Sequence, residues 1–315
     1  VGLDHVILVK LASTAVCGKL LGLTKFEILN ALSQVFLDGN SLRTYRHFPN
    51  TGSRKSWAAG DATARGVFLA MMSKKGEMGY PKVLSTKIWG FNDCLFNKKE
   101  LEVEQKFGSY VINNILFKIS YPAEFHAQTA IEAAIIIHPK IINNIENIKK
   151  ITIRTHESAM RIIDKKGTLN NPADRDHCIQ YMVAIGLIFG RLVASDYEDD
   201  IASDPRVDKL RKKIFCIEDK SFTLDYLNPN KRSTANGITV EFYQGKKLKE
   251  IVIEYPIGHK RRRKEGIPLL IEKFNKNLGR CYNNRQVNKI MDVSLDLKKL
   301  VDMPVHDYLS LYSKK

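Results

Sequence analysis

Apolar and polar residues alternate in Gly237-Ile-Thr-Val-Glu-Phe-Tyr243 and again in Leu248-Lys-Glu-Ile-Val-Ile-Glu-Tyr255. Gln244 and Gly245 stand between the two runs, and a glycine in so short a connection is typical of a turn between paired strands. The pattern predicts an antiparallel hairpin. A third run, Lys150-Ile-Thr-Ile-Arg-Thr155, alternates in the same way, so the sequence predicts a small sheet confined to the second half of the chain.

Helices are predicted before these strands. Apolar and small residues from Val6 to Leu21 line most faces of a helix, which indicates a buried helix ended by Gly22. Thr24 and Glu27 have the spacing of a capping box, so another helix should start there and run toward residue 38. A third helical run covers residues 58–72.

Helices are also predicted between and after the strands. Asn171 followed by Pro172 has the form of a helix start, and one long apolar helix should run from there through Ile188. Further helical segments are expected at 204–214 and 267–312. Helices, then a strand, a helix and two strands, then helices again indicate an α+β fold: a mainly helical body with an inserted domain that carries the sheet.

The net charge of the chain indicates an anionic binding partner. The 315 residues include 50 Lys+Arg and 34 Asp+Glu, a formal net charge of +16. Such a surplus attracts anions, either the phosphates of a nucleic acid or a small polycarboxylate, and composition alone does not choose between them. Apolar runs are far shorter than the ~20 residues that span a bilayer. Together with the lack of a basic leader, this predicts a cytoplasmic protein with no membrane segment.

Cysteine spacing bears on the chemistry. The five cysteines are scattered, and none stands in a Cys-x-x-Cys pair: Cys17, Cys94, Cys178, Cys216 and Cys281. An iron–sulfur cluster usually takes its thiolates from one closely spaced run, and a structural zinc site usually shows paired ligands. We therefore expect no metal and no cofactor, and unpaired cysteines suit a reducing compartment.

The densest polar group comprises residues 43–47 (Arg-Thr-Tyr-Arg-His) and 51–57 (Thr-Gly-Ser-Arg-Lys-Ser-Trp). Glycine lets a backbone approach a ligand, while Arg54 and Lys55 supply fixed positive charge for carboxylates. The residue types favour an anion-binding site. A solvated polar loop explains them equally well.

A histidine stands between apolar residues in the segment Lys118-Ile-Ser-Tyr-Pro-Ala-Glu-Phe-His126. An imidazole titrates near neutral pH, so His126 is a candidate general base. The alternative is a hydrogen-bonded structural histidine, which is the commoner situation in a protein interior.

A third group lies at the predicted start of the long apolar helix, where Asp174-Arg-Asp-His177 precedes Gln180 and Tyr181. Residues three and four apart share one face of a helix, so His177, Gln180 and Tyr181 should lie together. Arg175 adds a cation close to a helix N-terminus, which favours anions. Helix capping and surface ion pairs are the alternative explanation.

One basic run, His259-Lys-Arg-Arg-Arg-Lys264, raises the hypothesis of a nucleic-acid-binding protein. No zinc-finger, RNP or helix-turn-helix pattern accompanies it, so a solvated face or a carboxylate-binding turn is the preferred interpretation.

Long contiguous segments of the chain resemble the MmgE/PrpD superfamily, and within it the bacterial members that act on 2-methylcitrate. They are residues 41–47, 54–63, 76–81, 117–120, 122–126, 170–185, 196–199 and 252–259. One departure is Gly186, where the pattern expects proline. Members of the superfamily also begin well upstream, so we expect this sequence to be about the last two-thirds of a longer protein, whose missing part supplies an Asp and a His to the active site.

The resemblance implies an architecture. A helical domain would be built from residues 1–116 and 259–315, with an α/β lid domain, residues 117–258, inserted between them. The active site would lie in the cleft between the domains, and the protein would be a homodimer.

The resemblance also implies an activity: elimination of water from 2-methylcitrate to give 2-methyl-cis-aconitate in propionate catabolism, without an iron–sulfur cluster. Citrate is a further candidate substrate. A base must remove a C–H proton beside a carboxylate, an acid must protonate the departing hydroxyl, and cations must hold three carboxylates. His126 is then the candidate base, Tyr181 or Lys55 the acid or oxyanion stabiliser, and the candidate carboxylate clamps are Arg54, Lys118, Arg175 and His177.

Rival functions stay open at this point. A decarboxylase or epimerase of the same superfamily would act on a similar polycarboxylate, because one fold hosts several chemistries. A basic nucleic-acid-binding protein is the rival from another class. A folded but inactive fragment is the third.

Overall fold

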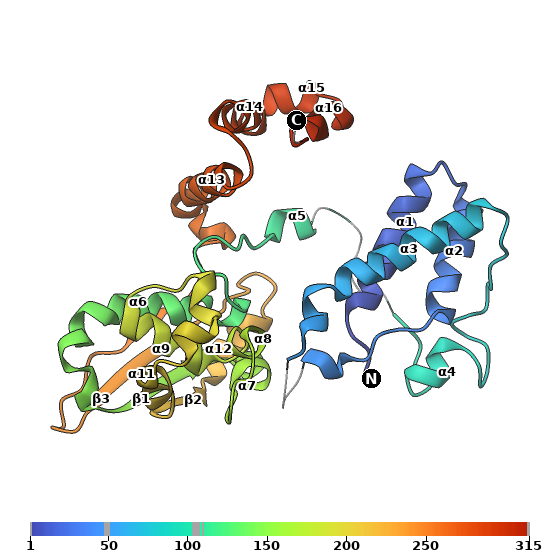
Figure 1. Cartoon of the computed structure of the whole chain (residues 1–315). Coiled ribbons are helices and arrows are strands. Elements are labelled where there is room, and N and C mark those ends of the chain that lie inside the picture. Colours follow the sequence, from blue (N-terminus) through green and yellow to red (C-terminus); the bar gives the residue numbers. More distant parts are fainter. Residues whose placement is uncertain (1, 47–50, 103–107, 109, 314–315) are drawn as a thin grey trace. The chain divides into compact units, whose positions relative to one another are not determined.

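A computed structural model describes residues 2–46, 51–102, 108 and 110–313. It shows a helix-rich chain with one small sheet, as the α+β prediction requires (Figure 1). The chain forms two compact units. Unit 1 comprises residues 1–108, 161–182 and 195–208, and unit 2 comprises residues 109–160, 183–194 and 209–315.

Unit 1 is organised around three packed helices: α1 (Val6–Leu20), α2 (Lys25–Leu37) and α3 (Ala58–Lys74) (Figure 1). The predicted capping box at the start of α2 is confirmed: the Thr24 side chain accepts from the Glu27 amide, and the Glu27 carboxylate accepts from the Thr24 amide. Gly22 follows α1 with a φ of +76°, a left-handed conformation that favours glycine and turns the chain toward α2.

The prediction that the first helix is buried on most faces is wrong. One line of α1 is buried, formed by Val6, Lys10, Thr14 and Gly18, whereas Leu8 and Leu20 remain 64% and 82% exposed. The buried line faces α3 at close range, because a Cβ atom on Gly66 would lie 3.0 Å from the Lys10 carbonyl oxygen. Small residues at the contact thus bring two backbones together and leave the opposite face of α1 uncovered.

The sheet belongs to unit 2 and has the strand order β2-β1-β3-β4. Its strands are β1 (Ile148–Thr155), β2 (Ile214–Glu218), β3 (Asn236–Phe242) and β4 (Ile251–Ile253). β3 pairs antiparallel with both β1 and β4, so the predicted hairpin and the predicted first strand are confirmed. Helix α6 (Gln128–Ile141) packs against β3 and β4.

The parallel strand β2 was not predicted. A helix was expected over 204–214, but α11 (Pro205–Arg211) ends before Ile214, which pairs with Ile151 of β1. β2 is only 5 residues long and only Ile214 is buried, so the alternation of its side chains is too short to distinguish from the end of a helix.

The predicted long helix from Pro172 is also wrong. Asn171 caps α8 (Pro172–Arg175) as expected, by accepting from the Asp174 amide at 3.0 Å. The helix then stops, and α9 (Ile179–Phe189) begins after a turn at residues 176–178. His177 therefore lies in a turn and does not share a helix face with Gln180 and Tyr181.

Four helices of the C-terminal segment confirm the prediction for 267–312: α13 (Arg263–Gly279), α14 (Asn284–Leu295), α15 (Leu297–Asp302) and α16 (Val305–Ser310). They enclose a small apolar core of their own, which includes Leu278, Val287 and Ile290.

The remaining α-helices are α4 (Phe91–Leu95), α5 (Tyr110–Asn114), α7 (Glu157–Ile163), α10 (Asp199–Ala202) and α12 (Lys220–Leu227). The 3₁₀ helices are η1 (Arg43–Arg46), η2 (Ser53–Ser56), η3 (Phe125–Ala127), η4 (Ile142–Asn147), η5 (Ala194–Tyr197) and η6 (Lys260–Arg262).

Within the described ranges, none of the helices combines the length and the apolar content that a bilayer crossing requires. The domain boundaries at 116 and 258 stay a prediction.

Candidate functional site

Lys55, on η2, meets two residues of the turn that separates α8 from α9. Its Nζ lies 3.0 Å from Oδ2 and 3.2 Å from Oδ1 of Asp176, and 3.1 Å from Nδ1 of His177. The three side chains are largely buried, with 25% of Lys55, 26% of Asp176 and 8% of His177 exposed. Two of the predicted site residues, Lys55 and His177, are thus brought together within unit 1.

The charges in this group support one another. Nδ1 of His177 also contacts Oδ1 of Asp176. Burial alone would raise the pKa of Asp176, but the hydrogen bond with His177 and the positive charge of Lys55 outweigh burial and hold that pKa below its usual value. A carboxylate only accepts, so it favours the tautomer with the proton on Nδ1. Nε2 of His177 then carries the lone pair, and the 3.1 Å approach of Lys55 Nζ to the protonated Nδ1 is a contact between two donors, not a hydrogen bond.

A buried hydrogen-bond network fixes the chain on both sides of this group. Asp174 Oδ1 accepts from the Thr51 amide at 2.7 Å and from Lys165 Nζ at 3.1 Å, and Lys165 Nζ also donates to Thr51 Oγ1 at 2.7 Å. The ion pair between Lys165 and Asp174 is 5% and 1% exposed. Loss of either partner would leave an unpaired buried charge, so the network holds residues 51–57 in one position against α8.

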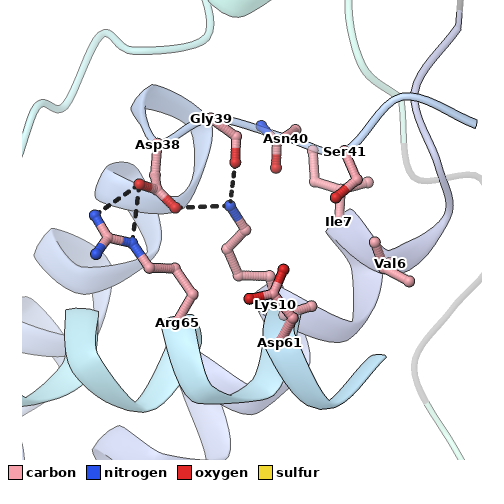
Figure 2. Close-up of a pocket in the computed structure, with 10 residues that line it drawn as sticks. Val6, Ile7, Lys10, Asp38, Gly39, Asn40, Ser41, Asp61 and Arg65 are labelled. Atoms are coloured by element: carbon pink, nitrogen blue, oxygen red, sulfur yellow. Dashed lines mark hydrogen bonds and ion pairs between the residues drawn. The ribbon is translucent and has the colours of Figure 1, made fainter. Parts of the chain in front are cut away.

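Arg54 is adjacent to Lys55 in sequence but has different partners. Its guanidinium donates to Asp61 at 2.9 Å and to Ser41 at 3.1 Å, and lies over the Trp57 ring, 4.2 Å from the ring centre. Asp61 and Ser41 also line a pocket of about 240 Å³ (Figure 2). Arg54 therefore reaches the edge of this pocket and not the Lys55 group.

The pocket itself is lined by paired charges. Asp38 lies between Lys10 and Arg65 in Figure 2, with Lys10 Nζ at 2.8 Å and Arg65 Nε at 2.9 Å. Lys10 Nζ also donates to the Gly39 carbonyl oxygen at 2.9 Å. These contacts neutralise both cations and tie the end of α2 to α1 and α3.

Arg175 and Tyr181 both bond to the segment around η5. The Arg175 guanidinium donates to the Tyr197 carbonyl oxygen and to Asp199 Oδ1, each at 2.6 Å. The Tyr181 hydroxyl donates to the Asp196 carbonyl oxygen, and burial raises the pKa of Tyr181 to about 12. In this structure the two side chains hold 196–199 in place, and a role in binding or proton transfer stays a prediction for both.

A second polar group lies in unit 2 and contains the predicted base. His126, on η3, has Nδ1 at 2.8 Å from Oε1 and 3.0 Å from Oε2 of Glu124, and Nε2 at 3.2 Å from the Tyr226 hydroxyl. The Tyr226 ring stacks on His156 with ring centres 4.5 Å apart. His126 is thus a hydrogen-bonded histidine, which the sequence offered as an alternative to catalysis, and its arrangement suits either role.

His156 is fully buried at the end of β1. Burial, reinforced by the neighbouring His126, lowers the pKa of His156 to about 4. Its Nδ1 accepts from the Ala159 amide at 3.3 Å, so the proton of the neutral ring is on Nε2. That Nε2 has no hydrogen-bond partner among the residues that the structure describes.

The described contacts of Lys118 and of the basic run are with other residues of unit 2. Lys118 is exposed, and its carbonyl oxygen accepts from Lys273 Nζ. In the basic run, Arg262 pairs with Glu132 at 2.8 Å and with Glu265 at 2.9 Å, while Lys260 donates to Asn114 at 2.7 Å. These cations serve internal contacts of unit 2, which weakens the argument for a nucleic-acid surface.

Four side chains of these groups had no role predicted from the sequence: Asp176 and Glu124, which lie within the singled-out polar segments, and His156 and Tyr226, which do not. Asp176 and Glu124 each stand within two residues of a predicted histidine, and a carboxylate so close to a histidine is the signal that could have found them. No local signal marks His156 and Tyr226.

His47 of the first polar group lies outside the described residues. In the described part of the chain, no group of three or more His, Cys, Asp or Glu side chains could hold a metal ion.

Comparison with known proteins places the chain in a family. The model of the MmgE/PrpD N-terminal domain matches residues 1–104, and that of the MmgE/PrpD C-terminal domain matches residues 121–297. The 2-methylcitrate dehydratase of Salmonella typhimurium is 61% identical over 99% of this chain and 65% of the relative, and that of Escherichia coli K12 is 60% identical over the same shares. The mitochondrial 2-methylcitrate dehydratase of Yarrowia lipolytica is 56% identical over 100% of this chain and 61% of the relative.

The chain therefore spans slightly less than two-thirds of the length of these relatives, with 65% of the two bacterial proteins covered. The two family models match most of its residues in chain order. Of the segments that suggested the resemblance, all but 117–120 lie within the matched ranges. The chain belongs to the MmgE/PrpD family.

Proposed function

We propose that the protein dehydrates 2-methylcitrate to 2-methyl-cis-aconitate in propionate catabolism, as a hydro-lyase. The observation that carries this proposal is the identity of 61% and 60% to bacterial proteins named 2-methylcitrate dehydratase, across 99% of this chain. The matched region includes both polar groups, because it covers almost every residue. Citrate is a second candidate substrate, since it carries the same three carboxylates.

The Lys55 group provides chemistry that this reaction needs. A partly exposed ammonium beside a polarised histidine can hold a carboxylate and offset the charge that develops when a C–H proton is removed. We propose that Lys55 stabilises this charge or protonates the leaving hydroxyl, with Tyr181 as the other candidate acid, and that His177 holds a carboxylate. Arg54, Lys118 and Arg175 remain proposed clamps, and Arg54 and Arg175 would exchange their present partners for substrate oxygens.

His126 remains the proposed general base. Its Nδ1 contact with Glu124 is the arrangement that orients a catalytic imidazole and stabilises its protonated form. We propose that the reaction uses side chains alone and no iron–sulfur cluster.

The proposed domain layout is a helical domain, 1–116 and 259–315, interrupted by a lid domain, 117–258. It is supported by a contact between the two ends of the lid: the Phe117 amide donates to the Gly258 carbonyl oxygen at 3.1 Å. An inserted domain needs its two ends close together, because both must connect to the same parent domain. A homodimer located in the cytoplasm completes the proposal, and light scattering on the purified protein tests the dimer.

The activity is tested by incubating the purified protein with 2-methylcitrate and following the products by NMR, with citrate and cis-aconitate as parallel substrates. The proposal expects a new vinylic product of dehydration, unaffected by an iron chelator. Carbon dioxide release or an epimerised substrate would instead identify the rival chemistries of the superfamily. Lys55→Ala and His126→Ala should each lose turnover, and near-wild-type turnover would remove that residue from the catalytic set.

A further inference from the structure

The two ring nitrogens of His126 have different partners, and together they give the hydrogen bonds a direction. A carboxylate only accepts, so Nδ1 of His126 donates to Glu124, whose oxygens lie 2.8 and 3.0 Å away. The neutral imidazole then has its lone pair on Nε2. The Tyr226 hydroxyl, 3.2 Å from Nε2, is therefore the donor. Hydrogen bonds run from Tyr226 to His126 to Glu124.

The main chain and the ring stack hold this arrangement in place. The His126 amide donates to Glu124 Oε2 at 2.8 Å, and the His126 carbonyl oxygen accepts from Asn236 Nδ2 on β3 at 2.9 Å. Both Glu124 and His126 are 14% exposed. Tyr226 is half-buried on α12, and its ring lies nearly parallel to that of His156, at an angle of 7°.

His156 supports the phenol without competing for its proton. Because burial lowers the pKa of His156 to about 4, the ring is neutral at neutral pH. Its Nδ1 is already the acceptor for the Ala159 amide. It therefore presents a flat uncharged surface to Tyr226, and the phenol proton is within hydrogen-bond reach of Nε2 of His126.

The lone pair of the proposed base is thus occupied by a phenol. A hydroxyl, an imidazole and a carboxylate in this order form the arrangement in which an imidazole activates a hydroxyl. We propose that Glu124, His126 and Tyr226 are a proton relay in which the Tyr226 oxygen, and not His126, exchanges a proton with the substrate. The proposal rests on the proposed function and names the group that acts on its substrate.

The proton steps balance. Tyr226 passes its proton to Nε2 of His126 as the phenol oxygen takes the C–H proton beside a substrate carboxylate. The C–H electron pair becomes the second bond of the C=C, the C–O bond breaks, and its electron pair leaves with the oxygen as hydroxide. Tyr226 then gives a proton to the departing hydroxide, which leaves as water, and recovers a proton from Nε2 of the His126 imidazolium that Glu124 stabilises. Tyr226 and His126 end the cycle as they began.

The test compares Tyr226→Phe, which keeps the ring that stacks on His156, with Tyr243→Phe. Tyr243 is a matched control because its ring is 65% exposed and contacts Lys213, which is not a member of the relay. The relay predicts that kcat of Y226F falls about 10²–10³-fold while KM changes by less than about threefold, since the loss concerns proton transfer. Y243F should match the wild type.

His126→Gln and the double variant separate a relay from two independent contributions. Residues that act as one unit are non-additive, so Y226F/H126Q should be no slower than the slower single variant. If Y226F retains kcat within about twofold of wild type while H126Q loses it, His126 acts on the substrate directly and the proposal is overturned.

A second measurement does not depend on turnover. In ¹⁵N spectra of the imidazoles, Tyr226→Phe should move the Nε2 resonance of His126 by removing its hydrogen bond, and leave Nδ1, bonded to Glu124, nearly unchanged. An Nε2 resonance that does not move overturns the relay. A wild-type protein that forms no product would instead refute the proposed function, while the spectra still decide whether the hydrogen-bond chain exists.

Discussion

Lys55 and Asp176 are 121 positions apart in the chain, yet Nζ of Lys55 lies 3.0 Å from the Asp176 carboxylate. The contact joins η2 to the turn after α8, and buried hydrogen bonds among Thr51, Lys165 and Asp174 secure it. The Asp176 carboxylate thus contacts both Lys55 and His177, and it holds a partly exposed cation that suits a polycarboxylate substrate.

Replacing Asp176 by Asn tests this constellation. The amide keeps the shape of the carboxylate but removes its charge, so Lys55 loses its counterion and His177 loses the acceptor that sets its tautomer. We expect kcat on 2-methylcitrate to fall about 10²-fold or more, with the fold retained. Asp307→Asn, at a side chain 57% exposed on α16, is the control that should leave turnover unchanged. Unchanged turnover in D176N would mean that the group has a structural role only.

His156 makes stability depend on pH. An ordinary histidine titrates near 6.5, whereas the pKa of His156 in the folded protein is about 4. Below pH 6.5 the unfolded chain binds the proton more readily than the fold, so the free energy of unfolding falls as the pH drops from 6.5 to 4, by about 3 kcal/mol in total. Thermal unfolding at a series of pH values measures this slope.

His156→Phe should flatten the slope in that pH window, because the phenyl ring keeps the stack on Tyr226 and does not titrate. His306→Phe is the control, since the His306 side chain is 83% exposed. If H156F and the wild type lose stability equally between pH 6.5 and 4, the dependence comes from other groups, such as His259, whose pKa is also lowered by burial.

Arg262 is expected to stabilise unit 2. It donates to Glu132 at 2.8 and 2.9 Å and to the Tyr255 carbonyl oxygen at 2.9 Å, and Glu132 is only 17% exposed. Arg262→Met would leave Glu132 partly buried without its cation, at a cost of about 2 kcal/mol in urea unfolding. Arg262→Met/Glu132→Met should recover part of that loss.

The exposed Lys264, two residues away, is the control for the same charge change. Lys264→Met should alter the free energy of unfolding by less than about 0.5 kcal/mol. Equal stability of R262M and K264M would refute the assigned role. A gel shift with DNA that weakens equally in both variants would revive the nucleic-acid hypothesis.

Gly258 is expected to tolerate no side chain. A Cβ atom there would lie 1.7 Å from the Phe117 carbonyl oxygen, and the atom in the way belongs to the backbone. Gly258→Ala must therefore separate two segments that are hydrogen-bonded to each other, and we expect a loss of about 3 kcal/mol or more in the free energy of unfolding. Gly279→Ala, where nothing lies within 4 Å of the added atom, should be neutral or slightly stabilising. Equal stability of the two variants would contradict this account.

Local signals predicted the elements that depend on neighbours in sequence. The capping box of Thr24 and Glu27, the Asn171 cap and the hairpin of β3 and β4 all follow from residues a few positions apart, and the structure confirms them. The α+β class followed from the same local patterns. The break between α8 and α9 did not follow from them, because the contacts made by α8 include a residue far away in the chain: the Thr51 amide donates to Asp174.

In the candidate site, too, some residues could be predicted from the sequence and others could not. Lys55, His126 and His177 stand in dense polar segments, so residue type and family resemblance selected them. Their partners are set by tertiary contacts: Tyr226 is 100 positions from His126, and no pattern around it distinguishes it from other tyrosines. For Arg175 and Tyr181, the residue type was noted but not the backbone carbonyl groups that their side chains bond to.

The parallel pairing of β1 with β2 has a kinetic consequence. The paired residues Ile151 and Ile214 are about sixty positions apart, and the chain between them carries Lys165, Asp174 and Asp176. Closing so long a loop has an entropic cost that must be met before the strands gain their hydrogen bonds, so this pairing should form late and limit the refolding rate. In a folding intermediate that has not reached this step, the hairpin of β3 and β4 would be formed, but β1 and β2 would not yet be paired. Such an intermediate would be prone to aggregate during refolding.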